Sequence, residues 1–198
     1  MSAQGIESFS LDNDPPVLGV IEPGAHMANA LSKTGKVAVL ATPGTIRSHA
    51  YPNALRNLNP NIEVHQVACP LFVPLAEEGW LDHEVTEIVA ETYLSELTNT
   101  GIDTVILGCT HYPLLEGIIA KVASRILGSE TRIINSASVV AKALQRKLAA
   151  LNLLSTQRDS PHHFFATDVS HRSQIVANRF WQGDSEPSPV FQHVDLPN

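Results

Sequence analysis

A thiol and an imidazole follow directly after a predicted apolar strand in the segment TVILGCTHYPLL, residues 104–115. Gly108 removes a side chain where a ligand could approach, and Cys109 and Thr110 then stand just ahead of a predicted helix. A thiol that faces the positive end of a helix has its pKa lowered from the usual ~8.5 towards neutrality. His111 could tune that thiol or exchange protons with it. The pattern indicates acid–base chemistry by Cys109, with a small buried cysteine as the equally open alternative.

A strand-to-helix turn, ATPGTI at residues 41–46, offers a second group of candidate residues. Its glycine and the hydroxyls of Thr42 and Thr45 could bind a carboxylate or phosphate, together with backbone N–H groups. The turn lacks the Gly-Lys-Ser/Thr ending of a Walker loop. The simpler alternative is that Thr45 caps a helix.

Glu77 and Cys69 are further candidates, each with a structural alternative. Glu77 belongs either to a solvated Glu-Glu-Gly turn or to a pocket in which it partners a histidine. Cys69 ends another apolar run and is either a second active thiol or part of the core. We favour the core for Cys69, because Pro70, Phe72 and Pro74 indicate a packed loop after it.

The composition excludes several classes of protein. The 198 residues include 13 basic and 20 acidic side chains, so the formal net charge is −7. A pI near 5.7 supplies no basic field for phosphates, which argues against a nucleic-acid partner. No apolar run approaches the ~18–20 residues that cross a bilayer, and the sequence starts without the features of a signal peptide. The two cysteines form no CxxC motif and the nine histidines no HExxH motif, so we expect no metal site and a cytoplasmic location.

Short β-branched runs alternate with amphipathic stretches from residue 17 onward. Most of the runs are apolar throughout, which is typical of strands covered on both faces of a parallel sheet. Strand and helix repeated in this way predict an α/β fold with a doubly wound parallel sheet. The predicted strands are Val17–Ile21, Val37–Ala41, Val64–Ala68, Thr104–Leu107, Arg132–Ile134 and Phe164–Ala166, and the predicted helices are Ala25–Leu31, Asp82–Thr98, Pro113 to near Gly128, Ser138–Leu151 and Ser170–Phe180.

Four segments together resemble glutamate racemases of the aspartate/glutamate racemase superfamily. They occur in the family's order and spacing, and the resemblance weakens after about residue 137. His111 favours glutamate as the substrate, because related aspartate and hydantoin racemases tend to carry an acid at that place. The segments are PVLGVIEPGA at 16–25, VAVLATPGTIRSHAY at 37–51, CPLFVPLAEEGWLD at 69–82 and DTVILGCTHYPLL at 103–115.

The resemblance implies interconversion of L- and D-glutamate without a cofactor, which supplies D-glutamate for peptidoglycan. In the family, one thiolate removes the α-proton and a second thiol donates a proton from the opposite face. Cys109 matches the second of those cysteines, Thr110 a residue that touches substrate, and His111 a residue that assists the thiol. Thr42 and Thr45 match threonines that hold the substrate's carboxylate.

The resemblance also implies a domain organisation. Glu77 matches an acid that pairs with the family's histidine. The family's first half-lobe, with an Asp-Ser pair and a Cys-Asn-Thr motif, has no counterpart in this sequence. We therefore expect a flexible leader at residues 1–15, a complete α/β racemase lobe at 16–131 and the carboxyl-terminal part of a second lobe at 132–198.

Two other functions stay open. One is a shortened, catalytically impaired racemase that binds glutamate or pairs with another subunit, including a second copy of itself, because missing strands would leave an open sheet edge. The other is a Cys-His hydrolase, which the close spacing of Cys109 and His111 disfavours.

Overall fold

A four-stranded sheet forms the centre of the molecule. The computed structural model describes residues 17–155, 162–181 and 188–195, and the leader expected at 1–15 lies outside these residues. The strands are β1 (Lys36–Ala41), β2 (Glu63–Ala68), β3 (Thr104–Leu107) and β4 (Arg132–Asn135). Their order in the sheet is β2-β1-β3-β4, and every neighbouring pair is parallel.

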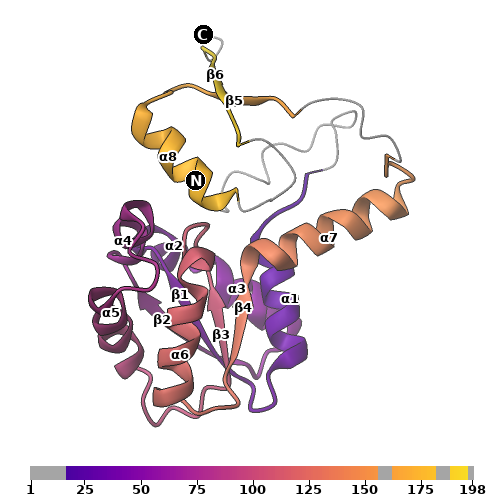
Figure 1. Ribbon diagram of the computed structural model, residues 1–198. Coiled ribbons are helices and arrows are strands. Elements are labelled where there is room, and N and C mark those ends of the chain that lie inside the picture. The colour runs from indigo at the N-terminus through magenta and orange to yellow at the C-terminus, as the bar shows by residue number, and fades with distance from the viewer. Residues whose placement is uncertain (1–16, 156–161, 182–187, 196–198) are drawn as a thin grey trace.

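Helices cover both faces of this sheet, so the predicted doubly wound α/β fold is confirmed (Figure 1). Among the helices that the structure describes, none is long and apolar enough to cross a membrane. One face carries α1 (Ile21–Leu31) and α3 (Ala50–Leu58), the other carries α4 (Phe72–Glu78), α5 (Glu84–Ser95) and α6 (Glu116–Ile126), and the short segments α2 (Pro43–Ser48) and η3 (Tyr112–Leu115, a 3-10 helix) precede α3 and α6.

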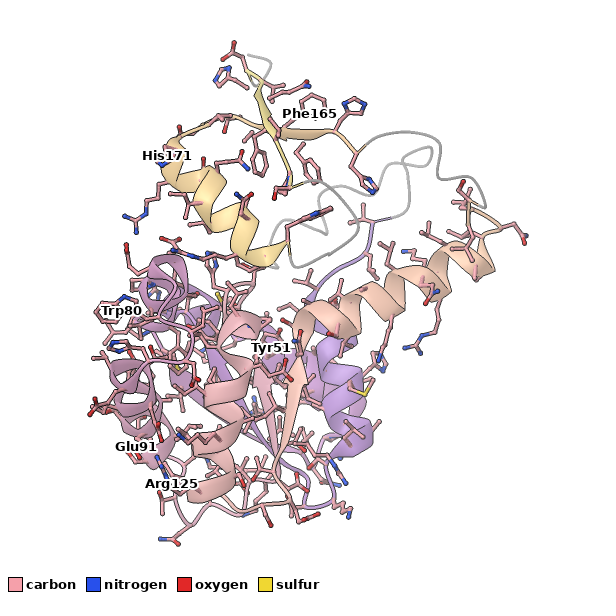
Figure 2. All side chains as sticks on the ribbon, viewed as in Figure 1. Tyr51, Trp80, Glu91, Arg125, Phe165 and His171 are labelled. Atoms are coloured by element: carbon pink, nitrogen blue, oxygen red, sulfur yellow. The ribbon has the colours of Figure 1, made fainter. Side chains whose placement is uncertain are left out.

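Successive residues of β1 point into two separate cores. Leu40 packs with α4, α5 and α6, whereas its neighbour Val39 packs with α1 and α3. Side chains alternate across a strand, so a strand with helices on both faces must be apolar at every position. Tyr51 of α3 adds a buried aromatic ring to the second core, and Figure 2 shows it well inside the molecule, whereas Phe165 lies at the periphery.

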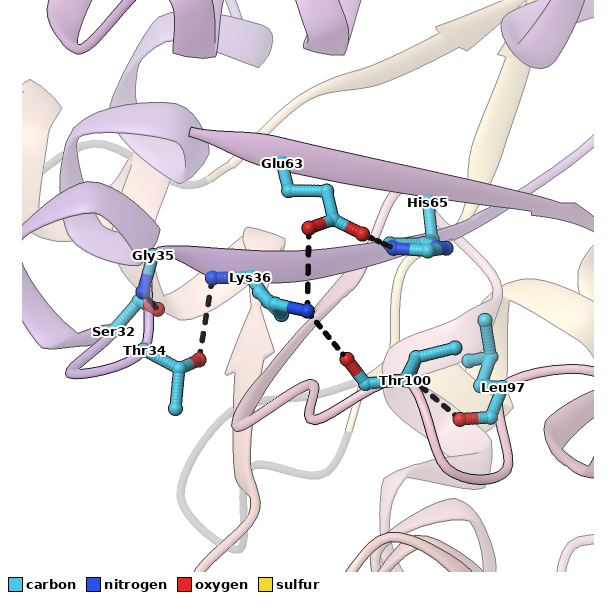
Figure 3. A network of polar contacts seen from close by, with 8 residues as sticks. All are labelled: Ser32, Thr34, Gly35, Lys36, Glu63, His65, Leu97 and Thr100. Carbon is cyan, nitrogen blue, oxygen red and sulfur yellow. Dashed lines mark hydrogen bonds and ion pairs between the residues drawn. The ribbon is translucent and has the colours of Figure 1, made fainter. Parts of the chain in front are cut away.

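Polar contacts join the amino-terminal ends of the strands (Figure 3). Lys36 Nζ lies 3.3 Å from Glu63 Oε2 and donates to the Thr100 carbonyl oxygen at 3.0 Å. Glu63 Oε1 also lies 2.6 Å from His65 Nε2. These hydrogen bonds, first from His65 and then from Lys36, hold the pKa of Glu63 below its usual value. Because exposed ion pairs contribute little free energy, the network mainly fixes the register in which Lys36 and Glu63 are partners.

A smaller unit follows the sheet in the sequence. The helix α7 (Ser136–Ala150) leads from β4 to two three-residue strands, β5 (Phe164–Ala166) and β6 (Phe191–His193), which pair in parallel. The helix α8 (His171–Phe180) lies between them in sequence, and in Figure 1 it lies over the carboxyl ends of the large sheet, next to α4. The large sheet extends past the boundary expected at residue 132, because β4 pairs with β3.

Three local predictions are wrong. The residues Val17–Ile21 form no strand, and α1 already begins at Ile21. The segment after Cys69 is the helix α4 and not a loop, because Pro74 lies in its first turn, where a missing N–H costs nothing. The helix predicted at Asp82–Thr98 is shorter, because α5 spans Glu84–Ser95 and is capped by His83, whose Nδ1 accepts from the Val85 N–H at 3.1 Å.

Candidate functional site

The carboxyl ends of β1 and β3 form the candidate site. These two strands are neighbours in the sheet, and from them the chain proceeds in opposite directions, β1 to β2 and β3 to β4. Open α/β sheets bind ligands at such a switch point. Because β1 continues into Thr42 and β3 continues through Gly108 into Cys109, the sheet brings together the two segments that the sequence predicts for the site.

Gly108 allows a close approach of other parts of the protein to the turn after β3. Its N–H donates to the Leu40 carbonyl oxygen at 2.8 Å. A Cβ atom at this position would lie 2.9 Å from Cε2 of the Tyr51 ring and 3.2 Å from the Leu40 oxygen. The glycine therefore lets the Tyr51 ring pack directly beneath the turn that carries Cys109.

Cys109 has a raised pKa, whereas the sequence analysis predicts a lowered one. Its side chain is partly buried, and this burial raises the pKa above its usual value. The backbone N–H groups of His111 and Tyr112 and the hydroxyl of Thr110 favour the thiolate, but their effect is smaller. The prediction is wrong because desolvation outweighs the donors at the start of the following helical turn. The free thiol is therefore mainly protonated at neutral pH.

A chain of polar contacts connects Cys109 to a carboxylate of α4. The Thr110 hydroxyl, which hydrogen bonds to Cys109, lies 3.3 Å from Nδ1 of His111. On the other side of the imidazole, Nε2 lies 3.4 Å from Oε1 of Glu77, so the expected contact between these two residues is present. In the tautomer with the proton on Nε2, that nitrogen faces the Glu77 carboxylate, and Nδ1 accepts from the Thr110 hydroxyl while Cys109 is a thiol. His111 therefore reaches the thiol through Thr110.

Thr42 and Thr45 lie in the turn after β1, the strand next to β3 in the sheet. Thr42, and not Thr45, is the helix cap: its Oγ1 accepts from the Thr45 N–H at 3.4 Å. The two hydroxyl oxygens are 3.2 Å apart. Both side chains are partly buried, so their hydroxyls form a short polar pair at the end of an otherwise apolar strand.

Cys69 is part of the core, as the sequence analysis favours. Its side chain is fully buried, and burial strongly raises the pKa of its thiol. Its backbone N–H donates to Ala41 at 2.9 Å, and its carbonyl oxygen accepts from the Tyr112 hydroxyl at 2.7 Å. Phe72 packs edge-on against the Tyr112 ring. Cys109 is thus the accessible member of the two cysteines in the sequence.

The profile of the Asp/Glu/Hydantoin racemase family matches residues 3–144, which include β1 to β4 and all six predicted site residues. The chain belongs to this racemase family. The family membership agrees with the resemblance drawn from the four sequence segments.

Individual racemases are similar over much of this chain. A glutamate racemase of Geobacter metallireducens is 46% identical over 183 residues, which are 92% of this chain and 66% of that protein. A crystal structure of a glutamate racemase isoform from Bacillus anthracis superposes with a TM-score of 0.84 at 35% identity and covers 98% of this chain and 70% of that one. The glutamate racemase of Francisella tularensis in complex with D-glutamate gives 0.80 at 33% identity, covering 92% and 65%. The chain spans less than two thirds of the length of curated glutamate racemases to which it is similar.

Several residues near the candidate site have no signal in the sequence analysis. The Tyr51 phenol lies near Cys109, and burial, followed by the charges of Cys109 and Glu22, raises its pKa to about 12. Arg172 and Phe180 of α8 contact Glu77 and His111, although α8 is far from both in sequence. A helix pattern predicts α8 itself, but no local pattern predicts that it returns to the sheet. In the described part of the chain, no three His, Cys, Asp or Glu side chains are placed to hold a metal.

Proposed function

We propose that this chain acts on glutamate as a racemase without a cofactor, and that Cys109 exchanges the α-proton of the substrate. The observation that carries the proposal is the position of Cys109 at the switch point between β1 and β3, connected to His111 and Glu77 through Thr110. The family membership and the D-glutamate bound to the similar protein of Francisella tularensis support glutamate as the substrate.

The hydroxyls near the thiol supply hydrogen bonds that the reaction needs. An α-proton beside a carboxylate is very weakly acidic, so the negative charge that develops must be stabilised by donors already in place. We assign Thr42, Thr45 and Thr110 to this role, because their hydroxyls lie at the ends of neighbouring strands. A substrate carboxylate held by these donors would place the α-carbon beside Cys109.

The pair of Glu77 and His111 controls the protons near the thiol in this proposal. Glu77 fixes the orientation and tautomer of the imidazole. The Thr110 hydroxyl donates to the imidazole while Cys109 is a thiol, and it donates to the sulfur instead when Cys109 is a thiolate. The raised pKa suits Cys109 for donating a proton, and hydrogen bonds from its three neighbours allow it to accept one.

The proposal extends to the setting of the reaction. D-Glutamate is a precursor of peptidoglycan, so we propose that the chain supplies it in the cytoplasm. We also propose two lobes that meet after β4, with the sheet and its helices as the first lobe and the part from α7 onward as the second. We further propose that a second copy of the chain pairs with the exposed side of the smaller unit.

Deuterium exchange tests the proposal directly. The purified chain is incubated separately with L- and D-glutamate in heavy water, and proton NMR follows the α-proton while chiral chromatography follows inversion. Cys109 alone accounts for exchange at one face of the α-carbon, whereas inversion needs an acid and a base on opposite faces. We expect deuterium at the α-carbon of at least one enantiomer. We expect inversion only if a second group donates or accepts a proton at the opposite face of the α-carbon.

Two cysteine variants serve as test and control. Cys109→Ser should abolish exchange, whereas Cys69→Ala should keep it, because the Cys69 thiol is buried away from the site. Absence of deuterium in both enantiomers with the folded wild-type chain would overturn the proposal, as would full exchange by Cys109→Ser.

A further inference from the structure

The two ends of α8 contact the two members of the pair formed by Glu77 and His111. In the first turn of α8, an Nη atom of Arg172 lies 2.7 Å from Oε1 of Glu78 and 3.5 Å from Oε2 of Glu77. At the last residue of α8, the Phe180 ring packs edge-on against the His111 imidazole, with ring centroids 5.4 Å apart and planes at 84°. One helix therefore touches both the carboxylate and the imidazole.

The end of α4 is shaped for this close contact. Gly79 follows Glu78 with a left-handed φ of +80° and caps α4. A Cβ atom at Gly79 would lie 3.0 Å from Cζ and Nε of Arg179, which is in the last turn of α8. Glycine thus serves two purposes here, because it adopts the left-handed conformation and leaves space for the guanidinium group.

We propose that Arg172 is a positioning residue of this site: it holds Glu77 at the distance that orients His111, while Phe180 fixes the imidazole ring from the other end of α8. The effect on catalysis rests on the proposed function, but the effect on the imidazole does not. The charged and titratable groups that face this pair are Arg172 and Arg179 from α8, Glu78 from α4 and Cys109 from the turn after β3.

The exposed fractions of these side chains explain why Arg172 affects the geometry of the site more than the stability of the fold. The Arg172 side chain is 64% exposed, whereas Glu77 and His111 are 30% and 24% exposed. An ion pair with so exposed a partner contributes little to the free energy of folding. A displacement of about 1 Å at a reacting group, in contrast, can lower a rate by up to about 100-fold. Arg172 therefore matters mainly for where Glu77 stands.

The structure offers a matched control on the opposite side of the molecule. Arg125 of α6 also joins two glutamates of one helix: it lies 3.0 Å from Glu87 and contacts Glu91, both in α5. Figure 2 shows Arg125 and Glu91 at the end of the molecule away from His171, where α8 begins. Arg125→Gln removes the same chemistry without touching the site.

NMR measurements test the inference without substrate. The wild-type chain should show a nuclear Overhauser contact between the His111 and Phe180 rings, and a ring-current shift of the His111 signals. Arg172→Gln should reduce that contact to less than about half, whereas Arg172→Lys and Arg125→Gln should keep it. An unchanged contact in Arg172→Gln, or an equal loss in Arg125→Gln, would overturn the inference. If Arg172→Gln detaches α8, the Glu78→Gln variant decides the question. This variant should weaken the contact between the His111 and Phe180 rings while α8 stays folded. An unchanged ring contact in Glu78→Gln would reject the inference.

The exchange of glutamate then separates this inference from the proposed function. Arg172→Gln should slow α-proton exchange about three- to tenfold through kcat with KM little changed, and Arg172→Lys should restore most of the rate. A wild-type chain that exchanges no α-proton would refute the proposed function alone, since the contact between the rings still decides the role of Arg172. Normal exchange by Arg172→Gln despite a lost ring contact would refute the effect of Arg172 on catalysis.

Discussion

The two cysteines show that a difference in burial changes the chemistry available to a thiol. Both follow a strand of the same sheet, yet Cys69 is fully buried and Cys109 only partly. The turn after β3 surrounds Cys109 with two backbone N–H groups and the Thr110 hydroxyl. Cys69 instead lies among apolar residues beneath Tyr112. Chemical use of a thiol at a sheet edge therefore depends on nearby donors as well as on its position in the fold.

At Gly108, even one methyl group should be costly. Gly108→Ala would place a Cβ atom 2.9 Å from the Tyr51 ring, which is itself buried between α1 and the sheet. We expect a loss of about 1–3 kcal/mol in the free energy of unfolding, as for other overpacked cores. The measurement is urea denaturation followed by circular dichroism.

Gly117→Ala is the matched control for this prediction. Gly117 lies in the first turn of α6, and a Cβ atom there would meet nothing within 4 Å. Alanine should therefore stabilise the helix by about 0.5–1 kcal/mol. Equal effects of the two substitutions would contradict the role that the structure gives to the Tyr51 ring.

Among the connections between elements, the one from α1 to β1 depends on a single carboxylate at the start of β3. Asp103 accepts from the Ser32 and Thr104 hydroxyls and from the N–H groups of Lys33 and Thr34. Partial burial works to raise the pKa of Asp103, but these four hydrogen bonds outweigh it and hold the pKa below its usual value. The carboxyl group therefore links the loop after α1 to the sheet most strongly in its charged form.

Asp103→Asn should therefore destabilise the protein in a pH-dependent way. A lowered pKa in the folded state gives a contribution that is complete above the unfolded pKa of about 3.9 and is lost as the pH falls through the folded value. We expect a difference of roughly 1 kcal/mol from wild type at pH 7, allowing for solvent screening, and a smaller one at pH 2. Urea titrations between these pH values measure it. The exposed Asp82→Asn is the control, and a pH-independent deficit of Asp103→Asn would refute the explanation.

The sequence predicts an element well when residues within or next to that element determine its structure. β3 and β5 begin and end where the sequence predicts, because a short apolar run between polar turns is a local signal. The sequence at Val17–Ile21 is equally apolar, but it precedes and enters α1, where Ile21 packs against the sheet. β6 was not predicted, because its three residues offer no periodicity and its partner β5 is distant in sequence.

The sequence predicts those residues of the candidate site that lie at the ends of strands. The positions of Thr42 and Cys109 follow from the rule that parallel strands end at one edge of a sheet. The contact of Arg172 with Glu77 depends on the path of the chain after α7, which no local pattern specifies. The raised pKa of Cys109 was also missed, because burial cannot be read from the two residues on either side.

Considered as a whole molecule, the protein has a rigid part and a loosely supported part. Every residue of β3 is buried, and β1 is buried apart from Lys36 at its start. In contrast, the described elements α7, β5, α8 and β6 contain no fully buried residue. A two-stranded sheet is only marginally stable by itself. The site therefore combines a thiol fixed by the large sheet with positioning contacts from a weakly packed helix.

Hydrogen exchange should separate these two parts. Amides of β1 and β3 should exchange only through global unfolding, whereas amides of α8 and β5 should open locally and exchange about 100-fold faster or more. The physical reason is that opening α8 exposes little buried surface and breaks mainly the exposed contacts of Arg172 and the Phe180 ring contact. Arg172→Gln should speed exchange in α8 further and leave β1 unchanged. The measurement is exchange followed by NMR at pH 7, and equal protection of α8 and β1 would show that the smaller unit folds as one cooperative body with the sheet.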